Sequence, residues 1–167
     1  MPDTPFTTNP NPTLLYLTPN LRSTIAKIRF VIDYRQGLTA LLGDVGMGKS
    51  SLVRLLHLEY SLREDCASVF IPTPNYPSDF GLLKGVCKEL GVAAKRSMVD
   101  QEEELRGFLF GCLQEGRNCV IWIDEAQKLN SKMLELVRTL LNLETNEQKL
   151  IQIVLVGQLE LLERLKE

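Results

Sequence analysis

A glycine-rich stretch contains the residues best suited to chemistry. Residues 43–50 read Gly-Asp-Val-Gly-Met-Gly-Lys-Ser and match the phosphate-binding pattern G-x-x-x-x-G-K-[ST]. Glycines let the backbone turn tightly, so that its N–H groups can point at phosphate oxygens. Lys49 would reach the β- and γ-phosphates of a nucleotide, and the Ser50 hydroxyl would coordinate Mg²⁺. The predicted cradle residues are Gly43, Asp44, Val45, Gly46, Met47, Gly48, Lys49, Ser50 and Ser51.

A second motif supplies two carboxylates. Residues 120–125 read Val-Ile-Trp-Ile-Asp-Glu, an apolar run that ends in two acids. Burying such carboxylates is costly unless they face a cation or solvent. Asp124 would hold Mg²⁺ through water, and Glu125 would polarise the water that attacks the γ-phosphate. Alone, this motif also fits an exposed acidic turn, but together with the cradle it predicts nucleotide hydrolysis.

Four other residues have side chains that could be functional or structural. Gln158 follows a later apolar run and has two interpretations. It contacts the γ-phosphate or the attacking water, as a third catalytic residue beside Lys49 and Glu125, or it is simply a polar residue at the start of a helix. His57 has no Ser or Cys partner pattern around it, which favours a surface or structural role. Arg138 flanks an apolar helix face, which favours a surface or packing role over that of an active cation. Trp122 is predicted to lie in the core.

The elements that must position these residues alternate in type along the chain. Apolar runs predict buried strands at 38–42, 66–71, 119–123 and 150–156. Helical spacing of apolar residues predicts helices at 21–32, after the cradle, from Ser78 or Asp79 to Gly91, from about 99, over 131–143, and from 159. This alternation predicts an α/β fold: a mainly parallel sheet with helices on both faces, a three-layer sandwich.

Composition predicts one soluble domain. The chain has 167 residues and a net charge of −2. The Pro-rich residues 1–13 are predicted to be flexible, and residues 14–167 to form the nucleotide-binding core. The four cysteines lie far apart, which favours reduced core thiols over a metal or redox site. We find no secretory signal and no apolar run of membrane-spanning length, so we expect a cytoplasmic chain without a membrane segment. Membrane association through partners or through parts outside this sequence stays an alternative.

The sequence resembles a known family of ATPases. The cradle and the Asp124-Glu125 pair resemble those of AAA+ ATPases. The wider context is similar to the ExeA/GspA-type ATPases of bacterial general secretion, and less closely to ATPases that regulate transposon target choice. The stretches that carry the likeness are 15–19, 37–51, 123–127, 136–145 and 153–158. It covers nearly the whole chain after about residue 13.

The resemblance implies roles for several residues. Lys49 and Ser50 match the family's nucleotide loop, Asp124 and Glu125 its metal and catalytic acids, and Gln158 its first sensor. The segment 16–18 would border the adenine. The family usually has Thr at the Ser50 position and Pro after the Gln158 position, where Leu159 stands here. The implied ligands are ATP and Mg²⁺. The implied partners are further copies of the chain in a homo-oligomer and proteins of a secretion or cell-envelope complex.

The resemblance leaves open how active this chain is and which function it serves. AAA+ proteins continue with an arginine finger, a further strand and a helical lid, whereas this sequence stops at Glu167, so we expect no C-terminal lid domain and slow turnover by this chain alone. A DNA-associated ATPase of the transposition-regulator kind is one alternative, disfavoured because 19 scattered Lys and Arg are outnumbered by 21 acids. A nucleotide-dependent interaction module with little hydrolysis is another, disfavoured by the intact Lys49, Asp124 and Glu125.

Overall fold

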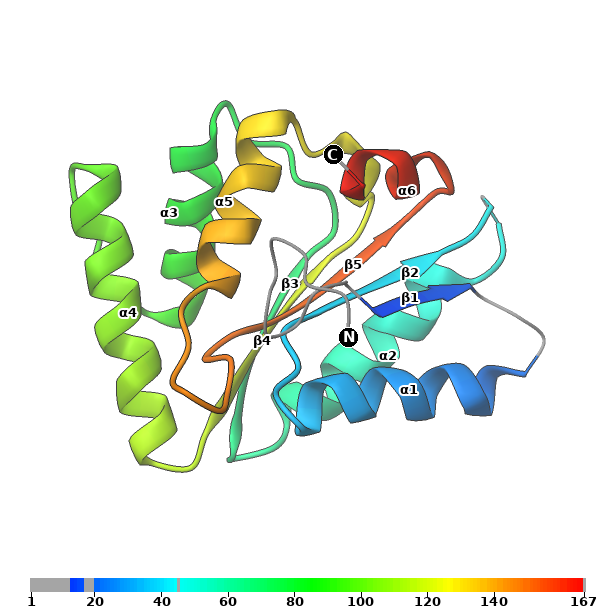
Figure 1. Ribbon diagram of the computed structural model, residues 1–167, viewed down its shortest axis with the longest axis horizontal. Coiled ribbons are helices and arrows are strands. Elements are labelled where there is room, and N and C mark those ends of the chain that lie inside the picture. The colour runs from blue at the N-terminus through cyan, green and yellow to red at the C-terminus, as the bar shows by residue number, and fades with distance from the viewer. Residues whose placement is uncertain (1–12, 17–19, 45, 167) are drawn as a thin grey trace.

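Five parallel strands form the central sheet of the computed structural model, which describes residues 13–16, 20–44 and 46–166 (Figure 1). The sheet has the strand order β1-β2-β5-β4-β3, and every neighbouring pair is parallel. The strands are β1 (Thr13–Tyr16), β2 (Leu38–Leu42), β3 (Cys66–Ile71), β4 (Asn118–Ile123) and β5 (Gln152–Gly157). Their carboxyl ends therefore meet at one edge.

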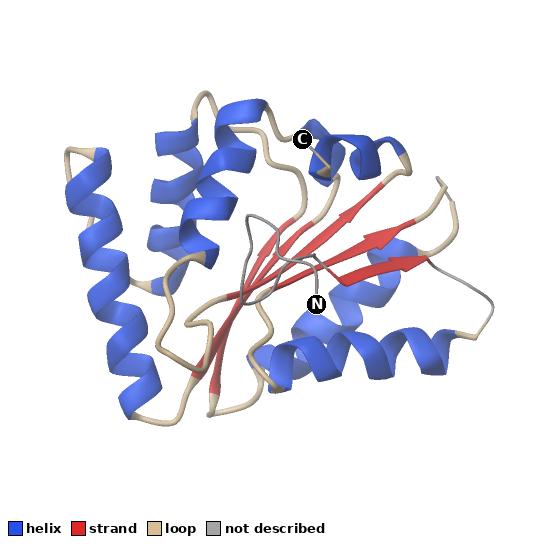
Figure 2. Ribbon diagram, viewed as in Figure 1, coloured by secondary structure: helices blue, strands red, loops and turns tan. Residues whose placement is uncertain are grey.

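Helices cover both faces of this sheet (Figures 1 and 2). One face carries α1 (Leu21–Asp33) and α2 (Lys49–Ser61), and the other carries α3 (Asp79–Leu90), α4 (Met98–Gln114) and α5 (Ser131–Leu141). The 3₁₀ turn η1 (Ala126–Lys128) follows β4, and the short α6 (Glu160–Leu165) follows β5. The predicted three-layer α/β sandwich is thereby confirmed.

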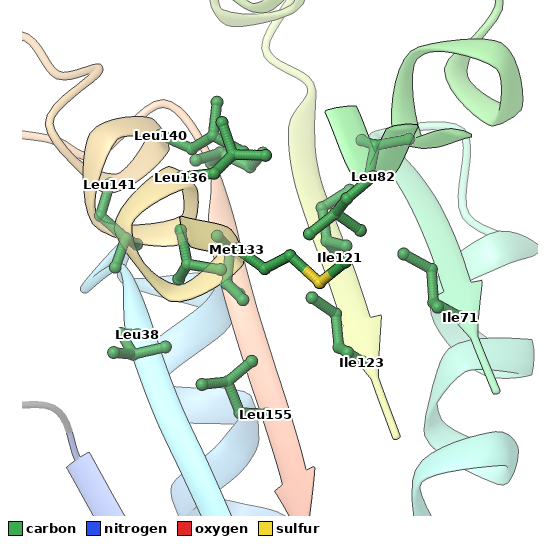
Figure 3. Close-up of a cluster of buried hydrophobic side chains, with 14 of the residues drawn as sticks. Leu38, Ile71, Leu82, Ile121, Ile123, Met133, Leu136, Leu140, Leu141 and Leu155 are labelled. Atoms are coloured by element: carbon green, nitrogen blue, oxygen red, sulfur yellow. The ribbon is translucent and has the colours of Figure 1, made fainter. Parts of the chain in front are cut away.

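The alternation of side chains along the strands produces two apolar cores. Leu38, Ala40 and Leu42 of β2 pack in the core beneath α3, α4 and α5, whereas Leu41 packs with α1 and α2 in the other core. Figure 3 shows the first core, where Met133 of α5 lies among strand residues that include Ile121 and Ile123. Burial on both faces explains why these strands read as continuous apolar runs.

Most predicted elements are confirmed, with small shifts at their ends. Ser78 caps α3 by accepting a hydrogen bond from the Gly81 N–H, and Gly91 ends that helix in a left-handed conformation. The helix predicted over 131–143 ends at Leu141, and the strand predicted over 150–156 begins at Gln152. Trp122 is fully buried, as predicted.

The fifth strand, β1, is absent from the sequence prediction. It is four residues long and pairs at the edge of the sheet with β2, so its pattern is too short to identify. β1 begins at Thr13, one residue before the predicted start of the core, and residues 1–12 lie outside the described part of the chain. The flexibility predicted for residues 1–13 stays a prediction.

All four cysteines are buried and free, as predicted. Burial raises the pKa of the Cys66 and Cys87 thiols to about 11, which keeps them protonated and unreactive at neutral pH. Within the described ranges, no helix has the length and apolar character needed to cross a membrane.

Candidate functional site

A cavity of about 360 Å³ lies at the carboxyl edge of the sheet. It opens where the chain leaves β2, β4 and β5, the usual position of ligand sites in parallel α/β sheets. The lining residues are Gly46, Gly48, Lys49, Ser50, Ser51, Asp124, Glu125, Gly157 and Gln158. The structure therefore brings both predicted motifs and Gln158 to one cavity, and it adds Gly157.

The backbone of the cradle adopts a conformation that requires glycine. Gly46 and Gly48 have φ angles of 86° and 87°, in the left-handed region that side chains disfavour. A Cβ atom at either glycine would meet nothing within 4 Å, so the requirement is conformational and not steric. Gly48 is the N-cap of α2 and supplies no side-chain cap. The first N–H groups of α2 are thus left available to an anion in the cavity.

Among the described cradle residues, Gly43, Asp44 and Met47 support the loop and are not part of the cavity lining. The Gly43 N–H donates to the Gly157 carbonyl at 3.2 Å, which ties the loop to the end of β5. The Asp44 N–H donates to the Met47 Sδ at 3.2 Å. Val45 lies outside the described residues.

Two opposite charges are buried at this cavity. The Lys49 side chain is 8% exposed, and its Nζ donates to the Asp44 carbonyl at 2.8 Å. Asp124 is 4% exposed, and its Oδ1 accepts the Glu125 N–H at 2.8 Å. Neither has an ion-pair partner among the described residues. Buried charges without a counter-charge are costly, so both side chains suit a ligand that brings charge of both signs.

Glu125 lies at a sharp turn between β4 and η1. Its φ of 53° is in the left-handed region, which is unusual for a residue other than glycine. Its Oε1 lies 3.4 Å from the Gln127 Nε2 and 3.4 Å from the Lys128 Nζ. The turn directs the Glu125 side chain to the cavity, next to Asp124.

Gln127 and Gly157 are the residues that sequence reasoning missed. The Gln127 Oε1 accepts the Gln158 N–H at 3.3 Å, so one side chain contacts both Glu125 and the end of β5. A glycine directly after an apolar strand was a visible signal for Gly157. For Gln127 no spacing rule predicts a contact across 31 positions.

His57 and Arg138 are not among the residues that line the cavity, and both make local contacts elsewhere. The His57 Nδ1 lies 2.8 Å from the Ser68 Oγ, and the imidazole stacks on Phe70. Desolvation lowers the pKa of His57. Arg138 pairs with Glu135 at 3.0 Å on α5.

The donor set suits a magnesium ion better than a transition metal. Within the described residues, no group of three or more His, Cys, Asp or Glu side chains is placed to hold a metal. Mg²⁺ keeps several waters and uses one or two carboxylates together with substrate phosphates. Asp124 and the Ser50 hydroxyl, both on the cavity wall, fit that requirement.

A family comparison agrees with this geometry. A model described as an AAA domain matches residues 32–165, which include every residue that lines the cavity. The chain belongs to the AAA family. This family of ATPase domains binds nucleotides, so the resemblance read from the two motifs is confirmed at the level of the family.

One relative supports the narrower resemblance. General secretion pathway protein A of Aeromonas hydrophila is 32% identical over 168 residues, which cover 98% of this AAA chain. The chain spans 30% of that relative's length.

Solved AAA-type structures share the fold. The Drosophila ORC bound to DNA superposes with a TM-score of 0.68 at 21% identity, over 84% of this chain and 38% of that one. Cdc6p from Pyrobaculum aerophilum gives a TM-score of 0.63 at 19% identity, over 87% of this chain and 41% of that one. At these identities the likeness shows the fold alone.

Proposed function

We propose that this AAA domain binds Mg·ATP in the cavity at the carboxyl edge of its sheet and hydrolyses the bond between the β- and γ-phosphates, releasing ADP and inorganic phosphate. The observation that carries the proposal is the pair of buried, uncompensated charges, Lys49 and Asp124, on the wall of one cavity. A triphosphate would bring the anion that Lys49 lacks, and its magnesium ion the cation that Asp124 lacks.

Each lining residue has a distinct task in this proposal. The N–H groups at residues 46–51 and the Lys49 ammonium bind phosphate oxygens. Ser50 and Asp124 hold Mg²⁺, which when bound neutralises charge on the phosphates. Glu125 accepts a proton from the attacking water as general base, and Gln158 orients the γ-phosphate or that water.

The base is proposed to be adenine. The sequence contains no Asn-Lys-x-Asp segment of the kind that reads guanine. Tyr16 ends β1 and pairs in register with Leu42, directly before the cradle. Its side chain is 50% exposed, so its ring is available to a base bound beside the phosphates. Of the segment predicted to border the adenine, residues 17 and 18 lie outside the described residues.

The proposed cellular role follows from the relative's name. Nearly the whole of this chain matches a general secretion pathway protein. We therefore propose that the chain acts in a secretion or cell-envelope complex. In this proposal it forms a homo-oligomer and acts from the cytoplasmic side. The DNA-associated alternative stays a prediction from sequence. Salt-dependent retardation of duplex DNA would favour it.

Calorimetric titration with Mg·ATP tests the site itself. The wild-type chain should bind, and Lys49→Met should weaken binding about 10- to 100-fold, since hydrogen bonds to charged groups contribute roughly 1.5–3 kcal/mol. The control is Lys132→Met, an exposed lysine on α5, which should bind like the wild type. Equal affinity of the Lys49 variant and the wild type would contradict the proposal.

A further inference from the structure

We propose that Gln127 is a positioning residue that fixes the Glu125 carboxylate relative to the end of β5. The inference rests on the proposed function, because it deepens the role given there to Glu125. Gln127 itself lines no part of the cavity. It lies on η1, the short turn between β4 and α5.

The Gln127 amide uses both of its polar atoms in this arrangement. Its Nε2 donates to the Glu125 Oε1 at 3.4 Å, and its Oε1 accepts the Gln158 N–H at 3.3 Å. The reversed amide would set oxygen against a carboxylate and NH₂ against an N–H, so the contacts fix the orientation of the amide. One side chain thus joins the proposed general base to the proposed γ-phosphate contact.

Gly157 makes this close approach feasible. A Cβ atom at Gly157 would lie 2.8 Å from the Gln127 Oε1, closer than real Cβ contacts occur. It would also lie 3.3 Å from the Gln127 backbone nitrogen. The last residue of β5 therefore has to be a glycine for the Gln127 side chain to reach Gln158.

The backbone of Gln127 is held independently of its side chain. The Arg164 Nη1 of α6 donates to the Gln127 carbonyl at 2.8 Å. The side chain therefore projects from a fixed point, and its loss should leave the turn in place. The two side-chain contacts to the Glu125 Oε1 differ in kind. Gln127 donates a hydrogen bond, whereas Lys128 makes an ion pair between exposed side chains, and such a pair contributes little to stability.

Positioning of this kind should affect turnover more than binding. A general base acts only within hydrogen-bond reach of its proton, and a displacement of about 1 Å can cost roughly 100-fold in rate. Gln127→Met keeps the length of the side chain and removes both hydrogen bonds. We expect kcat to fall about 10- to 100-fold, with the affinity for the non-hydrolysable analogue Mg·AMPPNP within about threefold of wild type.

Three further variants sharpen the test. Gln114→Met, at an exposed glutamine ending α4, should match the wild type in both measurements. Gln127→Glu keeps size and polarity but faces Glu125 with an oxygen, so it should lose turnover like Gln127→Met even if the latter folds poorly. If Lys128→Met loses turnover and both Gln127 variants keep it, the ion pair positions Glu125 and the inference is wrong. An equal loss of affinity and turnover in the Gln127 variants would also overturn it.

A measurement without nucleotide separates this inference from the proposed function. The side-chain amide resonances of Gln127 can be assigned in ¹⁵N spectra by their disappearance in Gln127→Met. They should shift in Glu125→Ala and stay in place in Lys132→Met. No shift in Glu125→Ala would overturn the Gln127–Glu125 contact whatever the chain hydrolyses. A shift in Glu125→Ala, combined with no binding of Mg·ATP by the wild-type chain, would overturn the proposed function alone.

Discussion

Lys49 and Asp124 are the residues on which the proposed chemistry depends most. Each is buried beside the cavity, and within the described part of the chain neither has an ion-pair partner. Folding alone would favour neutral side chains at both positions, because an unpaired buried charge is destabilising. Their burial is therefore better explained by a bound ligand than by stability.

Glu125 provides the sharpest residue-scale prediction. Glu125→Gln removes the proton acceptor while keeping the shape of the side chain, so hydrolysis should fall about 100- to 10,000-fold with ATP affinity retained, as expected for loss of a general base. Single-turnover hydrolysis and a filter-binding assay would measure the two effects. Unchanged single-turnover hydrolysis would assign the base to another residue.

Part of the candidate site could be predicted from the sequence, and part of it could not. The cradle and the two acids were identified because each motif fixes residue types at set spacings. Gln127 was not, because its role depends on the fold bringing η1 against the end of β5 and on the missing Cβ of Gly157. No local spacing encodes that contact.

At the scale of elements, the start of α2 decides whether the cradle forms. Gly48 caps this helix with a φ of 87°. Gly48→Ala should lower the free energy of unfolding by about 1–2 kcal/mol, the usual cost of a left-handed alanine. Displacement of the first N–H groups of α2 should also weaken Mg·ATP binding.

Gly107→Ala is the matched control for that substitution. Gly107 is an exposed residue inside α4, and a Cβ atom there would meet nothing within 4 Å. Alanine should therefore raise the free energy of unfolding by about 0.5–1 kcal/mol. Urea unfolding of both variants compares the two glycines. Equal effects would show that the left-handed conformation of Gly48 is not required.

The packing of α2 on β3 should make stability depend on pH. His57 of α2 is the chain's single histidine, and its Nδ1 lies 2.8 Å from the Ser68 Oγ of β3, which also accepts the Trp122 Nε1–H at 2.8 Å. Desolvation lowers the pKa of His57 in the folded chain below its unfolded value of about 6.5. The unfolded chain therefore binds more protons in this window, and the unfolding free energy should rise as pH increases from about 5 to 7.5.

His57→Asn isolates this effect, because the variant has no imidazole to titrate. The difference in unfolding free energy between wild type and variant should increase with pH over that interval. A difference that is constant with pH would mean that His57 has the same pKa in the folded and the unfolded chain.

At the scale of the whole molecule, the layers were predictable and the order of the strands was not. Apolar runs such as 119–123 revealed buried strands because parallel sheets are covered on both faces. The order β1-β2-β5-β4-β3 depends on which strands pair across the chain, and β1 was too short to recognise. The cavity at the carboxyl edge has the position that is usual for ligand sites in a parallel sheet.

The composition of the cavity predicts how the whole domain should behave as an enzyme. Within the described residues, Lys49 is the single cationic side chain on the cavity wall, which also contains the two acids Asp124 and Glu125. Phosphoryl transfer gains roughly 10³- to 10⁵-fold when an arginine from the same or a neighbouring chain stabilises the transition state. If neighbouring copies supply that cation, turnover per chain should be slow in dilute solution and rise steeply with chain concentration. Steady-state hydrolysis over a hundredfold range of concentration, with sedimentation of the same samples, measures this. Fast turnover by a monomer would show that one copy completes its own site.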